Sequence, residues 1–196
     1  MTRGRDGVAY LTIEGREAPL AVAVLHELEA ALARAQGDGA FRSIVISARE
    51  RDLVPGAGPA EPAFTAAVLA VLGRIDDGAK RVYAAIGGAA LGAAFEIVLA
   101  CDGLYAGPAA RFGFTPAAPP TSGSRALERL TKLTGAETAR AMLEGEPSDA
   151  LEGYGSELLD GILVNDLLDD VSVFARREAA LPRGRYDAAS NLQPAT

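Results

Sequence analysis

Residues 84–102 decide the fold, and they read AAIGGAALGAAFEIVLACD. The run begins inside a short apolar segment, residues 81–86, that is typical of a buried strand. Gly87 and Gly88 break this strand, and the composition of residues 90–101 favours a helix. Small residues before a helix let a ligand approach the backbone, and free N–H groups of a first helical turn suit an anion. The stretch therefore predicts a strand, a glycine-rich loop and a helix that contains Glu96.

The flanking sequence repeats this alternation of strands and helices. Apolar and β-branched segments predict strands at residues 7–13, 42–47, 81–86 and 103–106. Helical spacing of apolar residues predicts helices at residues 20–35, 63–75, 90–101, 124–133, 136–143 and 149–158. Residues 49–62 and 112–122 are rich in Gly or Pro and are expected to be loops. The order predicts one α/β domain with largely parallel strands over residues 1–180, and a flexible tail at 181–196.

Composition excludes several classes of protein. The 196 residues are 49% hydrophobic with a formal net charge of −7, which suits one folded domain. No basic stripe is visible, so a nucleic-acid partner is not expected. Cys101 is the single cysteine, so no intrachain disulfide can form. No secretory signal and no run of about 18 apolar residues is present, which favours a cytoplasmic protein without a membrane partner.

Two glycine-rich loops follow predicted strands, and in open α/β sheets this edge binds ligands. The first contains Pro55-Gly56-Ala57-Gly58, and the second is the loop at residues 87–94. Tight turns and close helix packing would explain the same glycines. A dinucleotide site is disfavoured because the second loop has the form G-G-x-x-x-G, not G-x-G-x-x-G. A P-loop is absent because no Gly-Lys-Ser/Thr follows.

The sequence resembles the crotonase (enoyl-CoA hydratase/isomerase) superfamily from about residue 7 to residue 170. Residues 84–102 are similar to the family signature A-x-N-G-x-A-x-G-G-G-x-E-L-x-L-A-C-D. Weaker matches follow in the family's order: ARFG at 110–113, LTKLTG at 130–135, ARAML at 139–143, GEP at 145–147 and GILVN at 161–165. The resemblance implies a β-β-α spiral core with flanking helices and a truncated C-terminal helical part.

This resemblance also implies a site for an acyl-CoA or another acyl thioester. Family members hold the thioester oxygen with two backbone N–H groups, which by position would be those of Ala57 and Ala94. Glu96 matches a catalytic carboxylate of the hydratases. The positions expected to lie around the substrate are Gly56, Gly58, Gly88, Gly92, Ala93 and Arg16. Arg16, with Arg49 and Arg51, would meet the CoA phosphates. Coenzyme A would enter only as part of the substrate, and no metal or separate cofactor is expected.

The sequence departs from the hydratase pattern at a second catalytic position. Hydratases carry a Glu shortly after the Phe-Gly pair, whereas residues 112–120 here read FGFTPAAPP. A single carboxylate suits isomerisation, decarboxylation or enolate carbon–carbon bond formation better than hydration. Two alternatives remain open: a non-catalytic acyl-CoA binding protein, and a structural subunit that supports a thioester enzyme. The resemblance further implies a homo-oligomer, trimer or hexamer, or a hetero-complex.

Several conspicuous residues have simpler explanations. His26 is expected on the polar face of a helix, and no partner cluster suggests a metal. Cys101 lies in an apolar run and is expected to be a small buried side chain. Asp102 is expected to be structural, and Tyr83 and Phe95 are expected in the core. Thr121, Ser122 and Ser124 form a polar loop, and without a paired His they do not indicate a nucleophile.

Overall fold

In a computed structural model of the protein, the structure describes residues 2–3, 7–13, 20–49, 52–53, 61–164 and 166–180. A six-stranded sheet with the order β1-β2-β3-β4-β6-β9 forms the centre. Its strands are β1 (Thr2–Arg3), β2 (Val8–Thr12), β3 (Ser43–Arg49), β4 (Arg81–Ile86), β6 (Gly103–Ala106) and β9 (Gly161–Ile162). β1 is antiparallel to β2 and every other pair is parallel, so the prediction of a largely parallel α/β fold is confirmed.

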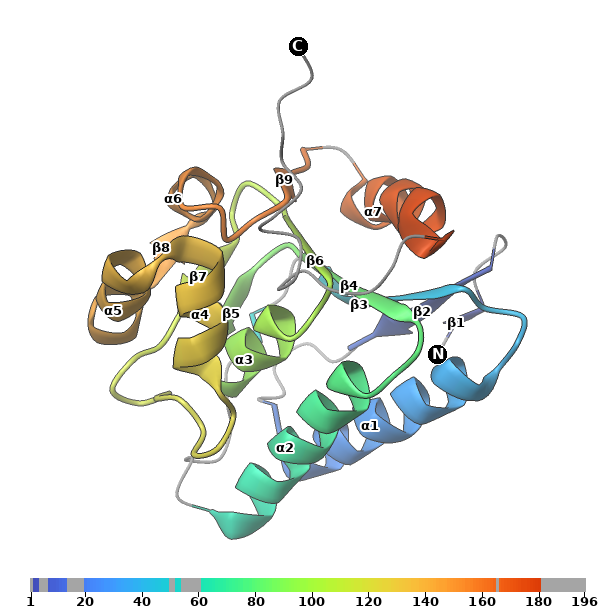
Figure 1. The fold of residues 1–196 in the computed structure, drawn as a ribbon, viewed down its shortest axis with the longest axis horizontal. Coiled ribbons are helices and arrows are strands. Elements are labelled where there is room, and N and C mark those ends of the chain that lie inside the picture. Colours follow the sequence, from blue (N-terminus) through green and yellow to red (C-terminus); the bar gives the residue numbers. More distant parts are fainter. Residues whose placement is uncertain are drawn as a thin grey trace.

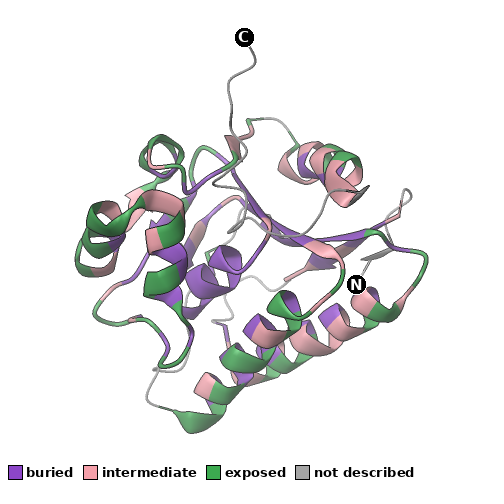
Figure 2. Cartoon of the chain, viewed as in Figure 1, coloured by how far each residue is buried: buried purple, intermediate pink, exposed green. Residues whose placement is uncertain are grey.

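Helices cover both faces of this sheet (Figure 1). One face packs against α1 (Val22–Gly37), α2 (Pro62–Asp76) and α3 (Ala93–Leu99), and the other against α7 (Leu167–Arg177). Strand residues alternate between two clusters: Ile44 and Ile46 lie with the first group of helices, whereas Val45 and Tyr83 lie with α7. Figure 2 shows that the buried residues lie along the strands and on the sides of the helices that face the sheet.

A second, three-stranded sheet stands beside the first in the order β5-β7-β8. It contains β5 (Ala89–Leu91), β7 (Arg111–Gly113) and β8 (Ser148–Asp149). The predicted helix at 90–101 was therefore wrong at its start, because residues 89–91 pair with residues 111–113 and the helix begins only at Ala93. The loop predicted at 112–122 likewise begins later, since Phe112 and Gly113 belong to β7.

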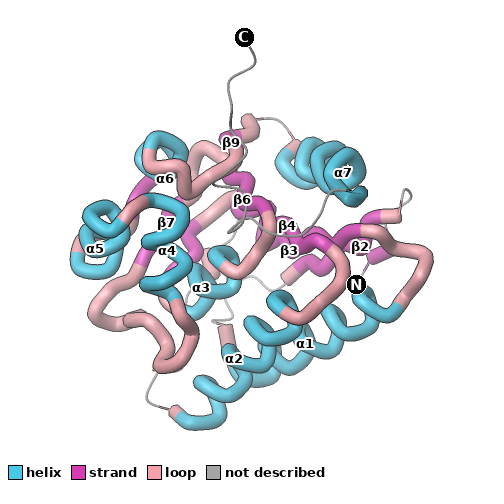
Figure 3. The backbone as a smooth tube through the Cα atoms, in the orientation of Figure 1, coloured by secondary structure: helices cyan, strands magenta, loops and turns pink. Residues whose placement is uncertain are grey.

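The remaining helices follow the small sheet in the chain. They are α4 (Ala126–Thr134), α5 (Ala136–Glu144) and α6 (Ala150–Gly155), and a 3₁₀ turn, η1 (Glu178–Ala180), follows α7. A long loop joins β7 to α4 and lies next to α3 (Figure 3). The helix predicted at 149–158 is shorter than expected, and Asp149 caps it together with Glu152 in a capping box.

Helix α7 had no counterpart among the predicted elements, although its sequence carries a helix signal. The Asp166 side chain accepts hydrogen bonds from the N–H groups of Leu168 and Asp169, and Val171 and Ala175 form a buried stripe one turn apart. After α7, Glu178 accepts hydrogen bonds from the Tyr83 hydroxyl (3.1 Å) and from Arg81 (3.2 Å). These two contacts fasten the end of α7 to β4.

The simpler assignments agree with the structure where residues are described. Tyr83, Phe95 and Cys101 are buried, and His26 is exposed. Asp102 is structural, because its carboxylate accepts a hydrogen bond from the N–H of Val82 at 2.8 Å. The tail predicted at 181–196 lies outside the described residues. In the described ranges, no helix has the length and hydropathy that crossing a membrane requires.

Candidate functional site

The glycine loop at residues 87–92 ends in the backbone turn that starts α3. Gly92 has φ 56° and ψ −125°, a conformation that residues with a Cβ rarely adopt. Its N–H donates to the carbonyl of Gly113 at 3.0 Å, and its carbonyl accepts from the N–H of Glu96 at 3.0 Å. Ala93 and Ala94 follow as the first two helical residues. Their N–H groups lie in the first turn, where no carbonyl of the same helix can accept from them.

The start of the first predicted loop lies against this glycine loop. The N–H of Leu53 donates to the carbonyl of Ala89 at 2.6 Å, and the N–H of Leu91 donates to the carbonyl of Leu53 at 3.0 Å. The Asp52 carboxylate also accepts from the N–H of Ala89 at 2.8 Å. The sequence analysis predicted that both loops lie at one edge of the sheet. In the structure, the described part of the first loop, residues 52–53, contacts the second loop.

Glu96 lies at the end of the first turn of α3 and is only 1% exposed. Its Oε1 atom accepts two hydrogen bonds of 2.6 Å, from the N–H of Thr121 and from the hydroxyl of Ser124. Its Oε2 atom is buried and has no hydrogen-bond partner among the described residues. We call Glu96, Thr121 and Ser124 the Glu96 cluster. An oxygen that is buried without a partner is costly, which marks this carboxyl as a functional candidate.

Burial raises the pKa of Glu96 above its ordinary value of 4.5. The hydrogen bonds from Ser124 and Thr121 act in the opposite direction, as does the positive charge of Arg129, but burial dominates. A carboxyl whose pKa is raised can accept or donate a proton nearer to neutral pH than an exposed glutamate.

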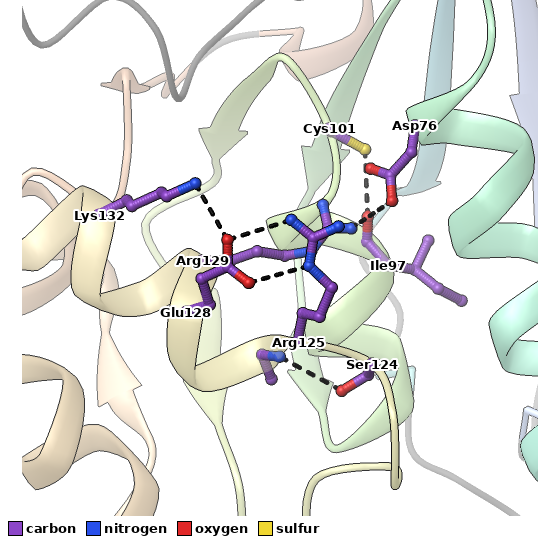
Figure 4. A network of polar contacts seen from close by, with 9 residues as sticks. Asp76, Ile97, Cys101, Ser124, Arg125, Glu128, Arg129 and Lys132 are labelled. Atoms are coloured by element: carbon purple, nitrogen blue, oxygen red, sulfur yellow. Dashed lines mark hydrogen bonds and ion pairs between the residues drawn. The ribbon is translucent and has the colours of Figure 1, made fainter.

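Helix α4 supplies the partners around this carboxyl. The Ser124 hydroxyl accepts a hydrogen bond from the N–H of Ala126, the first residue of α4, at 3.3 Å. One turn later Arg129 is buried and forms an ion pair with Asp76 of α2 at 2.5 Å. Figure 4 shows Ser124 at the start of α4 and Arg129 directed to Asp76. The buried guanidinium brings a positive charge to the side of α4 that faces α3.

An apolar cavity lies on the other side of α3, between this helix and the main sheet. Its volume is about 10 Å³, close to the least that holds one water molecule. The lining residues are Ile13, Leu20, Ile46, Leu53, Ala84, Ile86, Ala94, Ile97, Val98 and Cys101. Ala94 therefore contributes its side chain to this cavity, whereas Glu96 contacts the loop before α4.

The structure brings together the predicted site residues of the second loop. Gly88, Gly92, Ala93 and Ala94 lie between the end of β4 and the start of α3, and Glu96 follows on the same helix. Ala57, Gly56, Gly58, Arg16 and Arg51 lie outside the described residues, as does the side chain of Arg49. Sequence reasoning did not connect Thr121 and Ser124 to Glu96, because 25 and 28 residues separate them from it.

A family model described as enoyl-CoA hydratase/isomerase matches residues 3–153. The chain belongs to this family. The match includes both glycine loops and Glu96, so the resemblance to crotonases in the sequence is confirmed.

Individual relatives agree with the family. A protein of Rhizobium meliloti (strain 1021) named "Probable enoyl-CoA hydratase" is 28% identical over 190 residues, 91% of this chain and 73% of that protein. A protein of Mycobacterium avium with the same type of name is 36% identical over 113 residues, 56% of this chain and 44% of its own length.

Solved structures share the fold of this family member. A Pseudomonas aeruginosa protein has a TM-score of 0.80 and 29% identity, and the match covers 95% of this chain and 86% of that one. An enoyl-CoA hydratase from Bacillus anthracis has a TM-score of 0.78 at 23% identity, covering 97% of this chain and 81% of that one. Within the described residues, no group of three or more His, Cys, Asp or Glu side chains is placed to hold a metal ion.

Proposed function

We propose that this family member catalyses enolate chemistry on an acyl-CoA or related acyl thioester, with Glu96 as the only acid–base side chain. The observation that carries the proposal is the Glu96 carboxyl itself, which is buried, has a raised pKa and has no partner for Oε2 among the residues that the structure describes. Its place in the first turn of α3 puts it close in sequence to the first-turn N–H groups of Ala93 and Ala94. The names of the relatives support the substrate class.

In the proposed step Glu96 acts as a base toward the α-carbon of the acyl group. The C–H bond breaks, its proton goes to the Glu96 carboxylate, and its electron pair moves into an enolate. A backbone N–H of the first turn, with that of Ala57 as the second donor, would hydrogen-bond the enolate oxygen. Return of the proton to another carbon completes an isomerisation. Hydration is not proposed, because residues 112–120 provide no second carboxylate to activate a water.

The test is exchange of the α-protons of a medium-chain 3-enoyl-CoA, whose α-carbon is saturated, with deuterated solvent. We expect Glu96→Gln to keep the thermal shift caused by the ligand and to slow exchange about 10²- to 10⁴-fold, the usual contribution of a general base. Ala93→Pro and Ala94→Pro each remove one N–H at a helix start that tolerates proline, and the variant that slows exchange identifies the donor. Equal exchange by the wild type and Glu96→Gln contradicts the proposal.

A second candidate is acyl-CoA binding without catalysis. The lack of a second carboxylate in residues 112–120 favours it. Thermal unfolding with CoA, acetyl-CoA and the enoyl-CoA distinguishes the candidates from a purely structural subunit. A ligand at about 100 times its Kd stabilises a protein by about 2.7 kcal/mol. A shift without α-proton exchange favours simple binding, and no shift with any of the three favours the structural subunit.

A further inference from the structure

The two oxygens of Glu96 have very different surroundings. Oε1 accepts both hydrogen bonds, each of 2.6 Å, whereas Oε2 is equally buried and accepts none from the described residues. Short hydrogen bonds to a carboxylate are strong and directional. Within the described part of the chain, the carboxyl group is therefore held by one oxygen, and the other has no hydrogen-bond partner.

The Ser124 hydroxyl is oriented by its own neighbours. It accepts from the N–H of Ala126 at 3.3 Å, so its proton is directed to Oε1 of Glu96. The N–H of Ser124 donates to the carbonyl of Thr121 at 3.1 Å, which closes a tight turn. Arg125 adopts the left-handed conformation, with φ 62°, directly before α4. This turn presents the N–H of Thr121 and the hydroxyl of Ser124 to the same atom.

We propose that Ser124 is a positioning residue that, with the N–H of Thr121, anchors Glu96 by Oε1 and thereby assigns proton transfer to Oε2. The inference rests on the proposed function for its catalytic meaning. The N–H of Ala126, the hydroxyl of Ser124 and Oε1 form a chain of hydrogen bonds that begins at the positive end of α4. Such a chain polarises each of its members and strengthens the hold on the carboxylate.

The charges near Glu96 agree with this role. Arg129 of α4 is the cation that acts on Glu96, and it is paired with Asp76 of α2. Strand β5 presents only Ala and Leu side chains. The hydrogen bond from Ser124 lowers the pKa of Glu96 against the larger effect of burial. Loss of the hydroxyl is therefore expected to raise the pKa further.

The experiment compares Ser124→Ala with Ser122→Ala, an exposed serine of the same loop. The pKa of Glu96 is measured by ¹³C NMR of the labelled carboxyl, without any ligand. We expect the pKa to rise in Ser124→Ala, to stay unchanged in Ser122→Ala and to return toward the wild-type value in Ser124→Thr. In α-proton exchange, the rise in rate with pH should move to higher pH and the limiting rate should fall about tenfold to a hundredfold.

An unchanged Glu96 pKa in folded Ser124→Ala overturns the proposal. If that variant does not fold, the wild type provides the measurement: the amide proton of Thr121 should titrate together with the Glu96 carboxyl, and a Thr121 amide that does not respond overturns the anchor. A wild type with these NMR properties but without α-proton exchange would refute the proposed function alone. Altered exchange with an unaltered pKa and pH profile would refute the positioning role alone.

Discussion

The Glu96 cluster and the exposed face of α4 each contain a glutamate, and their surroundings shift the pKa values of the two side chains in opposite directions. Glu96 is buried and accepts hydrogen bonds from neutral groups, and its pKa is raised mainly by burial. Glu128 is on the surface, 32 residues later, and accepts hydrogen bonds from Arg125 at 2.9 and 3.1 Å and lies 3.1 Å from Lys132. These cationic partners lower the pKa of Glu128 to about 2. Figure 4 shows Arg125 and Lys132 converging on it.

Proximity to α4 therefore does not determine the direction in which the pKa of a carboxyl is shifted. Arg129 belongs to the same helix and faces inward, but its charge is engaged by Asp76 and only partly offsets the burial of Glu96. Full charge compensation would hold Glu96 ionised, as Glu128 is. Without it the pKa of Glu96 stays above its ordinary value, which favours the proton transfer that the proposed chemistry needs.

Arg129→Met removes the charge that links the two regions and should have the largest effect. Arg129 is 4% exposed but its partner Asp76 is exposed, so solvent weakens the ion pair and we expect a loss of about 2 kcal/mol in the free energy of unfolding. The pKa of Glu96 should rise further. Urea unfolding checks the first result and carboxyl ¹³C NMR the second. A double-mutant cycle with Asp76→Asn should show coupling, and simple additivity would contradict the ion pair as the cause.

Glu96→Gln should change how stability depends on pH. A carboxyl whose pKa is raised by folding stabilises the native state fully at pH values below its unfolded pKa, and this contribution is lost as pH rises through the folded pKa. The glutamine variant does not ionise, so its melting temperature should improve relative to the wild type as the pH rises above the ordinary glutamate pKa of 4.5. A constant difference above that pH would mean that the pKa of Glu96 is not raised.

Glu128→Gln should have the smallest effect. Its lowered pKa means that the surface ion pairs stabilise the protein above the ordinary pKa of 4.5 and lose their effect as pH falls toward about 2. Because these pairs are exposed, solvent and salt weaken them. We expect a slightly lower melting temperature at low salt and no difference from the wild type at about 1 M salt. A large, salt-independent loss would contradict the contrast with Glu96.

Residue patterns predicted the main strands and most helices, and the errors have two causes. The helix predicted at 90–101 begins with β5, because residues 89–91 pair with β7 and contact Leu53, both distant in sequence. Local propensity cannot show such pairing when the residues are Ala and Leu, which also favour helices. Helix α7 was missed for a different reason: its Asp166 cap and its Val171–Ala175 stripe are visible in the sequence but were not used.

The sequence alone predicted the family, the order of the main strands and most helices, and a helix containing Glu96 after a glycine-rich loop. These properties depend on local spacing and on residue types that the backbone demands. The burial and the hydrogen-bond partners of Glu96 depend on the tertiary structure. Glu96 is buried where α3 meets the loop before α4. There Thr121 and Ser124 hydrogen-bond Oε1, and no described residue bonds Oε2. The pKa of a carboxyl follows from that surrounding, because desolvation and hydrogen bonds act through space and not along the chain.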